Sequence, residues 1–287
     1  MSDEAGENTD AEREVGTVRR YGGGLRLAVS TLTVLRVGVA ADVGPGVVGA
    51  AMVCAPLVGA GLGLAAGLAG LAARGWTGSN LLAGVVGVAA LAACTRALHL
   101  DGLADTTDGL GSNKPAAEAL DIMKRSDIGP FGVAALVLLT VFQIACLDAA
   151  FQHGRGLIGA VAAAVAGRLA VTVACTPAVP SARPEGLGAW VAGTVRVRTA
   201  VVAGVLATVA CGGLGLIPGI ASDLAGSTAH ERIGTAILAA AAVPVGLGAA
   251  LVLLRRCVTR FGGITGDVLG ALVETGTAAA LLVLAFH

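Results

Sequence analysis

The chain has 287 residues, of which 55% are hydrophobic and only 13% are charged. Soluble globular domains carry about a quarter charged residues, so the composition excludes an ordinary soluble domain and indicates apolar surface that faces lipid. The formal net charge is zero, which gives no support for a nucleic-acid partner, and we expect none. The six cysteines are scattered without a Cys-x-x-Cys pair, so neither a zinc site nor a disulfide framework is indicated.

The first part of the chain is polar. Residues 1–24 are predicted to form a disordered tail that stays in solvent. This stretch does not resemble a signal peptide, because no basic start leads directly into a short apolar core. The next segment, about 25–41, is apolar but carries Arg26 and Arg36. Such a segment is better accommodated at the membrane surface than across it, so we expect an interfacial or re-entrant helix.

The rest of the chain contains seven apolar stretches, each long enough to cross a hydrocarbon core as a helix of about 20 residues. Alanine, leucine, valine and glycine dominate them, and the ten-residue alternation of a membrane barrel is missing. The predicted fold is therefore an all-α, polytopic membrane helix bundle of about seven spans plus the N-terminal helix, with residues 25–287 forming one membrane-embedded domain. The predicted spans are 47–73, 80–98, 130–150, 157–177, 199–220, 234–254 and 268–286.

Basic residues between these spans, counted together with Arg96 at the end of the span 80–98, are distributed unevenly. Ten lie on the side of the N-terminus: Arg96, Lys114, Lys124, Arg125, Arg183, Arg196, Arg198, Arg255, Arg256 and Arg260. Three lie on the other side: Arg74, Arg155 and Arg232. The positive-inside rule assigns the richer side to the cytoplasm. We therefore predict a multi-pass protein of the plasma (cell inner) membrane, with its polar motifs facing the cytoplasm and its C-terminus outside.

The most informative polar stretch is HLDGLADTTDG, residues 99–109. Asp101, Asp105 and Asp108 are spaced i, i+4 and i+7, so their carboxylates share one helical face if the preceding helix continues through them. Three like charges repel each other, and a divalent cation removes that repulsion. Oxygen ligands favour Mg²⁺, Mn²⁺ or Ca²⁺ over zinc. The aspartates are thus predicted metal ligands, with His99 as a candidate base or phosphate donor, and a solvated acidic turn is the alternative.

A second polar stretch, residues 115–132, follows the acidic one. Pro115 can start a short helix whose Lys124 and Arg125 lie beside the acidic helix. Either could bind phosphate oxygens, the arginine through paired hydrogen bonds and the lysine as a point charge. The glycine–proline pair at 129–130 then turns the chain back into the membrane. An ordinary amphipathic surface helix is the alternative.

Two charged residues fall well inside predicted spans rather than near their ends, Arg168 and Glu274. A charge at mid-membrane costs at least about 2.5 kcal/mol on insertion scales, so each is expected to face a partner or a polar cavity. Asp267 lies seven residues before Glu274, after glycines that permit close approach of the backbone to a ligand. Either Asp267 or Thr265 could instead simply cap the last helix. The loop 180–188 is either a cover for a substrate or a plain connector.

Clustered carboxylates, basic residues and glycine-rich turns on one membrane face are what metal-assisted phosphoryl transfer needs. Carboxylates hold Mg²⁺, the metal neutralises phosphate charge, and Lys or Arg stabilises the leaving group. Every such stretch falls on one side of the predicted bundle. This favours a single active face over a transport path through the bilayer.

Four motifs, in this order along the chain, resemble those of the cobalamin synthase family, the adenosylcobinamide-GDP ribazoletransferases of cobalamin biosynthesis. They are HLDGLADTTDGL at 99–110, IMK at 122–124 followed by IGPFG at 128–132, Gly167-Arg168, and GGITGDVLG at 262–270. The resemblance covers the chain from about residue 25 onward. Family members usually have Lys-Asp-Ser-Arg where this chain has Lys124-Arg125-Ser126-Asp127. No role is therefore carried onto Arg125 or Asp127.

The resemblance implies a reaction. A hydroxyl of α-ribazole, or of its 5′-phosphate, attacks the cobinamide-linked phosphate of adenosylcobinamide-GDP, which releases GMP and forms adenosylcobalamin or its phosphate. Mg²⁺ is the implied cofactor, with Asp101, Asp105 and Asp108 as its ligands. The implied partners are the two substrates and the lipid bilayer, and contact with other enzymes of cobalamin biosynthesis is left open. The implied catalytic residues are His99, Asp101, Asp105, Asp108, Lys124, Arg168 and Asp267.

Other functions stay open on the sequence. Residues 105–109 match the opening D-x-x-D-G of CDP-alcohol phosphotransferases, but Ser112-Asn113 stands where an Ala-Arg pair is expected. A transporter for a corrinoid or another small molecule would distribute polar residues through several spans, whereas Arg168 and Glu274 are nearly alone inside them. A non-catalytic membrane scaffold would not need three aligned carboxylates.

Overall fold

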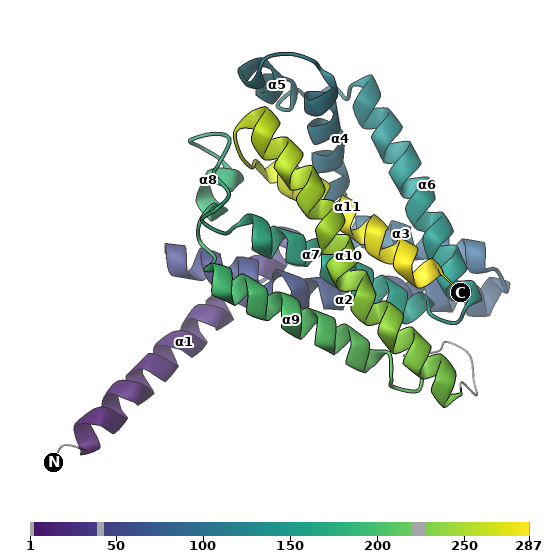
Figure 1. The fold of residues 1–287 in the computed structure, drawn as a ribbon, viewed down its shortest axis with the longest axis horizontal. Helices are drawn as coiled ribbons and strands as arrows, with labels where there is room; N and C mark the ends of the chain where they lie inside the picture. The colour runs from purple at the N-terminus through teal and green to yellow at the C-terminus, as the bar shows by residue number, and fades with distance from the viewer. Residues whose placement is uncertain (1–2, 39–42, 220–227, 287) are drawn as a thin grey trace.

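The computed structural model describes residues 3–38, 43–219 and 228–286. These residues fold into α-helices without a β-strand (Figure 1), which confirms the predicted all-α class. One isolated parallel bridge joins Ser181 and Ile264. The helices are α1 (Asp3–Leu32), α2 (Pro45–Thr77), α3 (Asn80–Cys94), α4 (Leu98–Gly111), α5 (Ala116–Ile122), α6 (Pro130–Gln152), α7 (Gly156–Ala174), α8 (Leu187–Val191), α9 (Val197–Leu214), α10 (Ala229–Phe261) and α11 (Gly266–Ala285).

Six helices in the described ranges are long and apolar enough to cross a membrane: α2, α6, α7, α9, α10 and α11. Each overlaps one of the predicted spans. Helices α7 and α9 end at Ala174 and Leu214, before the predicted ends at 177 and 220, and residue 220 lies outside the described residues. The remaining predicted span, 80–98, corresponds to α3, which has only 15 residues. It passes the same test only together with α4, from which it is bent by 89°. The structure thus supports a polytopic bundle of six or seven spans.

The break between α3 and α4 corrects one expectation. The Thr95 hydroxyl donates to the carbonyl of Leu91 (3.0 Å), and the next two residues, Arg96 and Ala97, both have a φ of 55°. Residues in this left-handed region do not continue a right-handed helix. The helix over 80–98 therefore does not continue through the aspartates, which was the condition under which the sequence places them on one face of that helix. The aspartates lie on the separate helix α4.

The N-terminal segment also differs from its prediction. Helix α1 begins at Asp3, where the sequence predicts a disordered tail over 1–24. The run Ala-Glu-Arg-Glu at 11–14 consists of good helix formers, which favours local helix even without tertiary contacts. Figure 1 shows the first half of α1 projecting away from the bundle. The second half packs on α2, and at Gly24 an added Cβ would lie only 2.7 Å from the Cβ of Ala50.

The predicted interfacial or re-entrant helix over 25–41 corresponds to this second half of α1, which ends at Leu32. Ala28 and Leu32 are buried against the bundle. This part of α1 is therefore packed on protein along one face. Residues 39–41 of the prediction lie outside the described residues.

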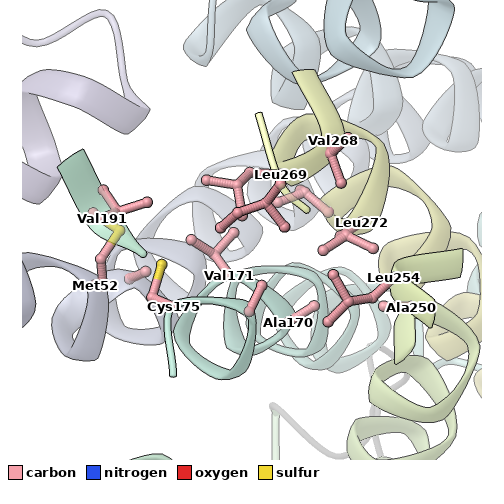
Figure 2. Packing of buried hydrophobic residues seen from close by; sticks show 14 of the residues in the cluster. Met52, Ala170, Val171, Cys175, Val191, Ala250, Leu254, Val268, Leu269 and Leu272 are labelled. Carbon is pink, nitrogen blue, oxygen red and sulfur yellow. The ribbon is translucent and has the colours of Figure 1, made fainter. Parts of the chain in front are cut away.

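The centre of the bundle is α7, whose residues are almost all buried, with α2 and α11 packed against it. Glycines permit this packing: a Cβ added to Gly59 or Gly63 of α2 would lie 2.5 Å from a carbonyl oxygen of α7. Small residues at such positions let membrane helices approach closely. Figure 2 shows the resulting cluster, in which Val171 of α7 lies near Leu269 and Leu272 of α11. The ends of these helices are thereby fixed relative to one another.

The helix ends that carry the polar loops gather at one end of the bundle. At this end Arg260, in the last turn of α10, donates a hydrogen bond to the carbonyl of Lys114, between α4 and α5. At the opposite end Arg155, before α7, donates to the carbonyl of Phe286, after α11 (2.6 Å). The structure thus brings together loops that the alternation of spans places on one side.

Candidate active site

Helix α4 crosses the start of α11 at short distance, and two glycines make this possible. A Cβ added to Gly102 would lie 2.6 Å from the carbonyl oxygen of Asp267, and one added to Gly270 would lie 3.1 Å from a carbonyl oxygen of α4. Any larger side chain at Gly102 would force the two helices apart. The crossing therefore brings Asp101 and Asp105 of α4 close to Asp267 of α11.

Asp101, Asp105 and Asp267 form what we call the acidic cluster. Asp101 is exposed, and the other two are partly buried. Burial opposes the charge of Asp105 most strongly, and the nearby charges of Asp267, then Asp101 and Asp108, oppose it further. Like charges held together in this way favour the binding of a cation among them. The structure thus adds Asp267 to the acids that the sequence groups on α4.

The start of α11 is fixed by Thr265. Its hydroxyl accepts a hydrogen bond from the backbone N–H of Val268 (3.2 Å), which is the contact of an N-cap. The same hydroxyl donates to the carboxylate of Asp267 (3.2 Å). Of the two capping candidates in the sequence, Thr265 is therefore the cap. The Asp267 carboxylate is held in place by the cap and is available to a ligand.

Arg183 supplies positive charge to the acidic cluster, since its charge favours the ionised forms of both Asp105 and Asp267. Its guanidinium also donates to the carbonyl of Leu120. In the sequence, Arg183 stands among the basic residues of the same membrane face and within the loop 180–188. No sequence pattern indicates that it lies beside the acidic cluster.

Backbone hydrogen bonds hold the Arg183 loop against the turn between α10 and α11. The N–H of Ala182 donates to the carbonyl of Ile264 (3.0 Å), and the N–H of Ile264 donates to the carbonyl of Pro180 (2.9 Å). Gly263 is required here, because a Cβ at this position would collide with the Pro180 carbonyl oxygen. The loop is therefore part of the scaffold around the acidic cluster.

Asp108 differs from the other acids of α4. Its buried carboxylate accepts hydrogen bonds from the backbone N–H groups of Gly129 (2.7 Å) and Gly132 (2.9 Å). These amides lie at the start of α6, where N–H groups have no partner within the helix. Asp108 thus caps α6 from a neighbouring helix, and its negative charge suits the positive end of the α6 dipole. The sequence did not predict this structural role.

Replacing Asp108 with alanine is expected to lower the free energy of unfolding by about 1–3 kcal/mol, because two N–H groups lose their acceptor. Asp108→Asn keeps one acceptor oxygen and should cost less. The measurement is unfolding of the purified protein in detergent micelles, with Asp121→Ala, which removes an exposed carboxylate, as the control. Wild-type stability of Asp108→Ala would contradict the capping role.

In the described ranges, no group of three His, Cys, Asp or Glu side chains is arranged to hold a metal ion. The predicted ligand set Asp101, Asp105 and Asp108 is therefore not preformed, since Asp108 is engaged by α6. Mg²⁺ commonly needs only one or two carboxylates, because substrate phosphates and water complete its shell. The hard oxygen donors of the acidic cluster fit that mode of binding.

Lys124 lies just after α5, and its side chain is 58% exposed. Its amino group is 3.7 Å from the carboxylate of Asp121. No contact described in the structure joins it to the acidic cluster. The catalytic role of Lys124 stays a prediction.

Arg168 lies within α7 and is 1% exposed, and its three guanidinium nitrogens have no hydrogen-bond partner among the described residues. Its charge partner is Glu274 of α11. Glu274 in turn accepts a hydrogen bond from the side chain of Gln143 of α6 (2.8 Å). The catalytic role of Arg168 stays a prediction. Its burial beside the charge of Glu274 also suits a residue that stabilises the packing of α7 on α11.

His99 is also buried, but it borders a cavity. Its side chain is 3% exposed, and neither ring nitrogen has a hydrogen-bond partner in the part of the chain that the structure describes. With Asp101 and Asp267 it lines a cavity of about 260 Å³. The structure therefore brings His99 to the acidic cluster, as the sequence motif suggested.

Comparison with known proteins identifies the family of the chain. The chain is 44% identical over 270 residues to an adenosylcobinamide-GDP ribazoletransferase of Frankia casuarinae, covering 91% of this chain and 93% of that protein. Proteins of the same name from Nocardioides sp. (38% over 257 residues; 90% and 96% covered) and Bradyrhizobium diazoefficiens (35% over 269 residues; 94% and 95%) are also similar. No solved structure matches the chain. The family model described as cobalamin-5-phosphate synthase matches residues 24–285, and the chain belongs to this family.

Proposed function

We propose that this chain is an adenosylcobinamide-GDP ribazoletransferase, which joins adenosylcobinamide-GDP to α-ribazole or its 5′-phosphate in a late step of cobalamin biosynthesis. The carrying observation is the acidic cluster with Arg183 beside it, at one end of a membrane bundle of this family. The names of the relatives favour this reaction over a CDP-alcohol phosphotransferase-like enzyme or a corrinoid transporter.

The reaction is a phosphoryl transfer. A hydroxyl of the acceptor attacks the phosphorus that is bonded to the cobinamide moiety, and a new O–P bond forms. The bond from this phosphorus to the oxygen that bridges the two phosphates breaks, so GMP leaves with the bridging oxygen and the acceptor hydroxyl loses its proton. The negative charge of the phosphates must be neutralised for the hydroxyl to approach.

The residues around the acidic cluster are suited to two parts of this reaction, phosphate binding and metal binding. Arg183 is suited to bind the substrate phosphates, since a guanidinium donates paired hydrogen bonds to phosphate oxygens. We propose that Asp101, Asp105 and Asp267 hold Mg²⁺, which supplies neutralisation of phosphate charge when it is bound. The glycine-mediated crossing of α4 and α11 keeps these carboxylates in place.

We further propose that the site faces the cytoplasm at the plasma membrane. The support is the excess of Lys and Arg in the loops that the structure gathers at the end of the acidic cluster. Because these helix ends lie side by side, their loops form a single polar face. Accessibility of an introduced cysteine in the 180–188 loop, in oriented vesicles, would test the assignment.

The function is tested with purified protein in liposomes that receive adenosylcobinamide-GDP and α-ribazole, with Mg²⁺ or with EDTA. GMP and the corrinoid product are measured. We expect release of GMP to require both substrates and Mg²⁺. Release that does not depend on α-ribazole would indicate hydrolysis, and equal rates in EDTA would contradict the proposed cofactor.

Asp101→Asn provides a matched test of the cluster. We expect the Mg²⁺ concentration needed for half-maximal rate to rise about 10–100-fold, since weakened metal ligation typically has effects of this size. Glu118→Gln is the control, because Glu118 is an equally exposed carboxylate near the same end and pairs with Lys114 (3.8 Å). A wild-type Mg²⁺ dependence in Asp101→Asn would remove Asp101 from the metal site.

A further inference from the structure

The cavity beside the acidic cluster has a mainly apolar wall. It has a volume of about 260 Å³. Six apolar side chains contribute to the wall: Leu32, Met52, Leu98, Val171, Leu187 and Leu269. The polar side chains at the cavity are Thr31, His99, Asp101 and Asp267. Such a site suits a small ligand with an apolar ring system and a polar end.

His99 is the second observation that points to a ligand. It is 3% exposed, and both ring nitrogens lack a partner among the described residues. Buried polar groups are almost always hydrogen-bonded, because leaving them unpaired costs free energy. The close contact of Gly270 with the backbone of His99 fixes the helix that carries the ring. A ligand in the cavity would supply a hydrogen-bond partner for one of these ring nitrogens.

The size and polarity of the cavity indicate which part of the two substrates it can hold. Pockets for drug-sized ligands hold about 300–1,000 Å³, so this cavity can take one ring system and cannot take a corrinoid. Guanine carries polar groups around its ring, which an apolar wall would leave unpaired. The dimethylbenzimidazole ring of α-ribazole is apolar except for one free ring nitrogen. That ring matches an apolar wall with a single imidazole.

We propose that this cavity binds the benzimidazole base of the acceptor, that His99 donates a hydrogen bond to its free ring nitrogen, and that the ribose extends toward Asp101 and Asp267. The inference rests on the proposed function, from which it takes the acceptor. It makes His99 a residue that determines which base is accepted. The acceptor hydroxyls then lie next to the acidic cluster, where the phosphates bind.

Two substitutions at the cavity test its occupant. Leu98 and Leu187 line the cavity and are 41% and 38% exposed, so the fold should tolerate Leu98→Trp and Leu187→Trp. We expect each to weaken binding of α-ribazole at least about 10-fold, because the indole takes up space that the ligand needs. Binding is measured by calorimetry on the protein in lipid nanodiscs. The KM for adenosylcobinamide-GDP should stay near its wild-type value.

Val202→Trp is the matched control. Val202 lines a different apolar cavity, of about 410 Å³, which includes residues of α2, α7 and α9 and none of the acidic cluster. We expect this variant to bind α-ribazole as the wild type does. A loss of α-ribazole affinity equal to that of the two cavity variants would overturn the assignment, since filling any apolar cavity would then have the same effect.

His99→Phe tests the hydrogen bond. The wild type should bind α-ribazole at least about 10-fold more tightly than an analogue whose free ring nitrogen is replaced by C–H, because the analogue leaves His99 unpaired. In His99→Phe this preference should disappear, since phenylalanine keeps an aromatic ring and removes the donor. An undiminished preference in His99→Phe would overturn the role of His99.

The experiment separates this inference from the proposed function. Suppose that the wild type binds α-ribazole but releases no GMP, and that Leu98→Trp and Leu187→Trp do not bind α-ribazole. The cavity assignment then stands and the transferase proposal fails. If the wild type releases GMP and both variants bind α-ribazole normally, the transferase proposal stands and the cavity assignment fails. A loss of affinity only for adenosylcobinamide-GDP in these variants would also overturn the assignment.

Discussion

Asp105→Asn is expected to lower the rate of GMP release by at least about 10²-fold, the scale seen when one group that stabilises transition-state charge is removed. Asp105 belongs to the acidic cluster, and its charge is opposed by those of Asp267 and Asp101. Removing that charge relieves repulsion, so the free energy of unfolding should stay unchanged or rise. The measurement pairs single-turnover release of GMP in liposomes with unfolding in detergent.

Asp148→Asn is the control for this substitution. Asp148 is also partly buried on a helix, but it lies in α6 near the opposite end of the bundle, where its carboxylate accepts a hydrogen bond from Gln152 (2.8 Å). Its variant should release GMP at the wild-type rate. Normal Mg²⁺-dependent release by Asp105→Asn would remove Asp105 from the proposed site.

Arg168→Met is expected to lower the free energy of unfolding by about 3–5 kcal/mol, the cost of leaving the buried charge of Glu274 without an opposite charge nearby. Arg168 is 1% exposed, and its charge partner is Glu274. Methionine fills much of the same space, so the loss of stability arises more from the uncompensated charge of Glu274 than from a cavity. Unfolding in mild detergent measures it.

The double variant Arg168→Met/Glu274→Gln separates structure from catalysis. Removing both charges should recover most of the stability, and the glutamine can still accept the hydrogen bond from Gln143. If activity returns together with stability, Arg168 acts by holding α7 and α11 together. A double variant that is stable but inactive would support the predicted catalytic role of Arg168.

The fold class follows from the sequence because lipid imposes a composition that soluble proteins do not need. Each of the six long helices contains an 18-residue window that is strongly apolar, close to the length needed to cross the hydrocarbon core. The second span is the exception. Hydropathy stays high up to Cys94, whereas the break depends on the left-handed backbone of Arg96 and Ala97. Apolar composition does not record a backbone conformation, so the bend could not be predicted.

The acidic site could be predicted only in part, for a similar reason. Asp101, Asp105 and Asp108 are equivalent by spacing, but only Asp108 faces the start of α6. The contact that distinguishes it joins residues more than twenty positions apart and depends on how α4 packs. The same holds for Arg183. Its charge acts on Asp105 only because backbone hydrogen bonds hold its loop against the turn before α11.

The gathering of the motif-bearing loops at one end of the bundle has a thermodynamic consequence for the proposed function. In that proposal both substrates arrive and both products depart on the same side of the bilayer, so turnover would move no net charge through it. A membrane voltage acts on a process only through the charge displaced across the membrane, and it therefore does no work on this one. The proposed reaction would then be driven by the phosphoanhydride bond that is broken, and not by the membrane voltage.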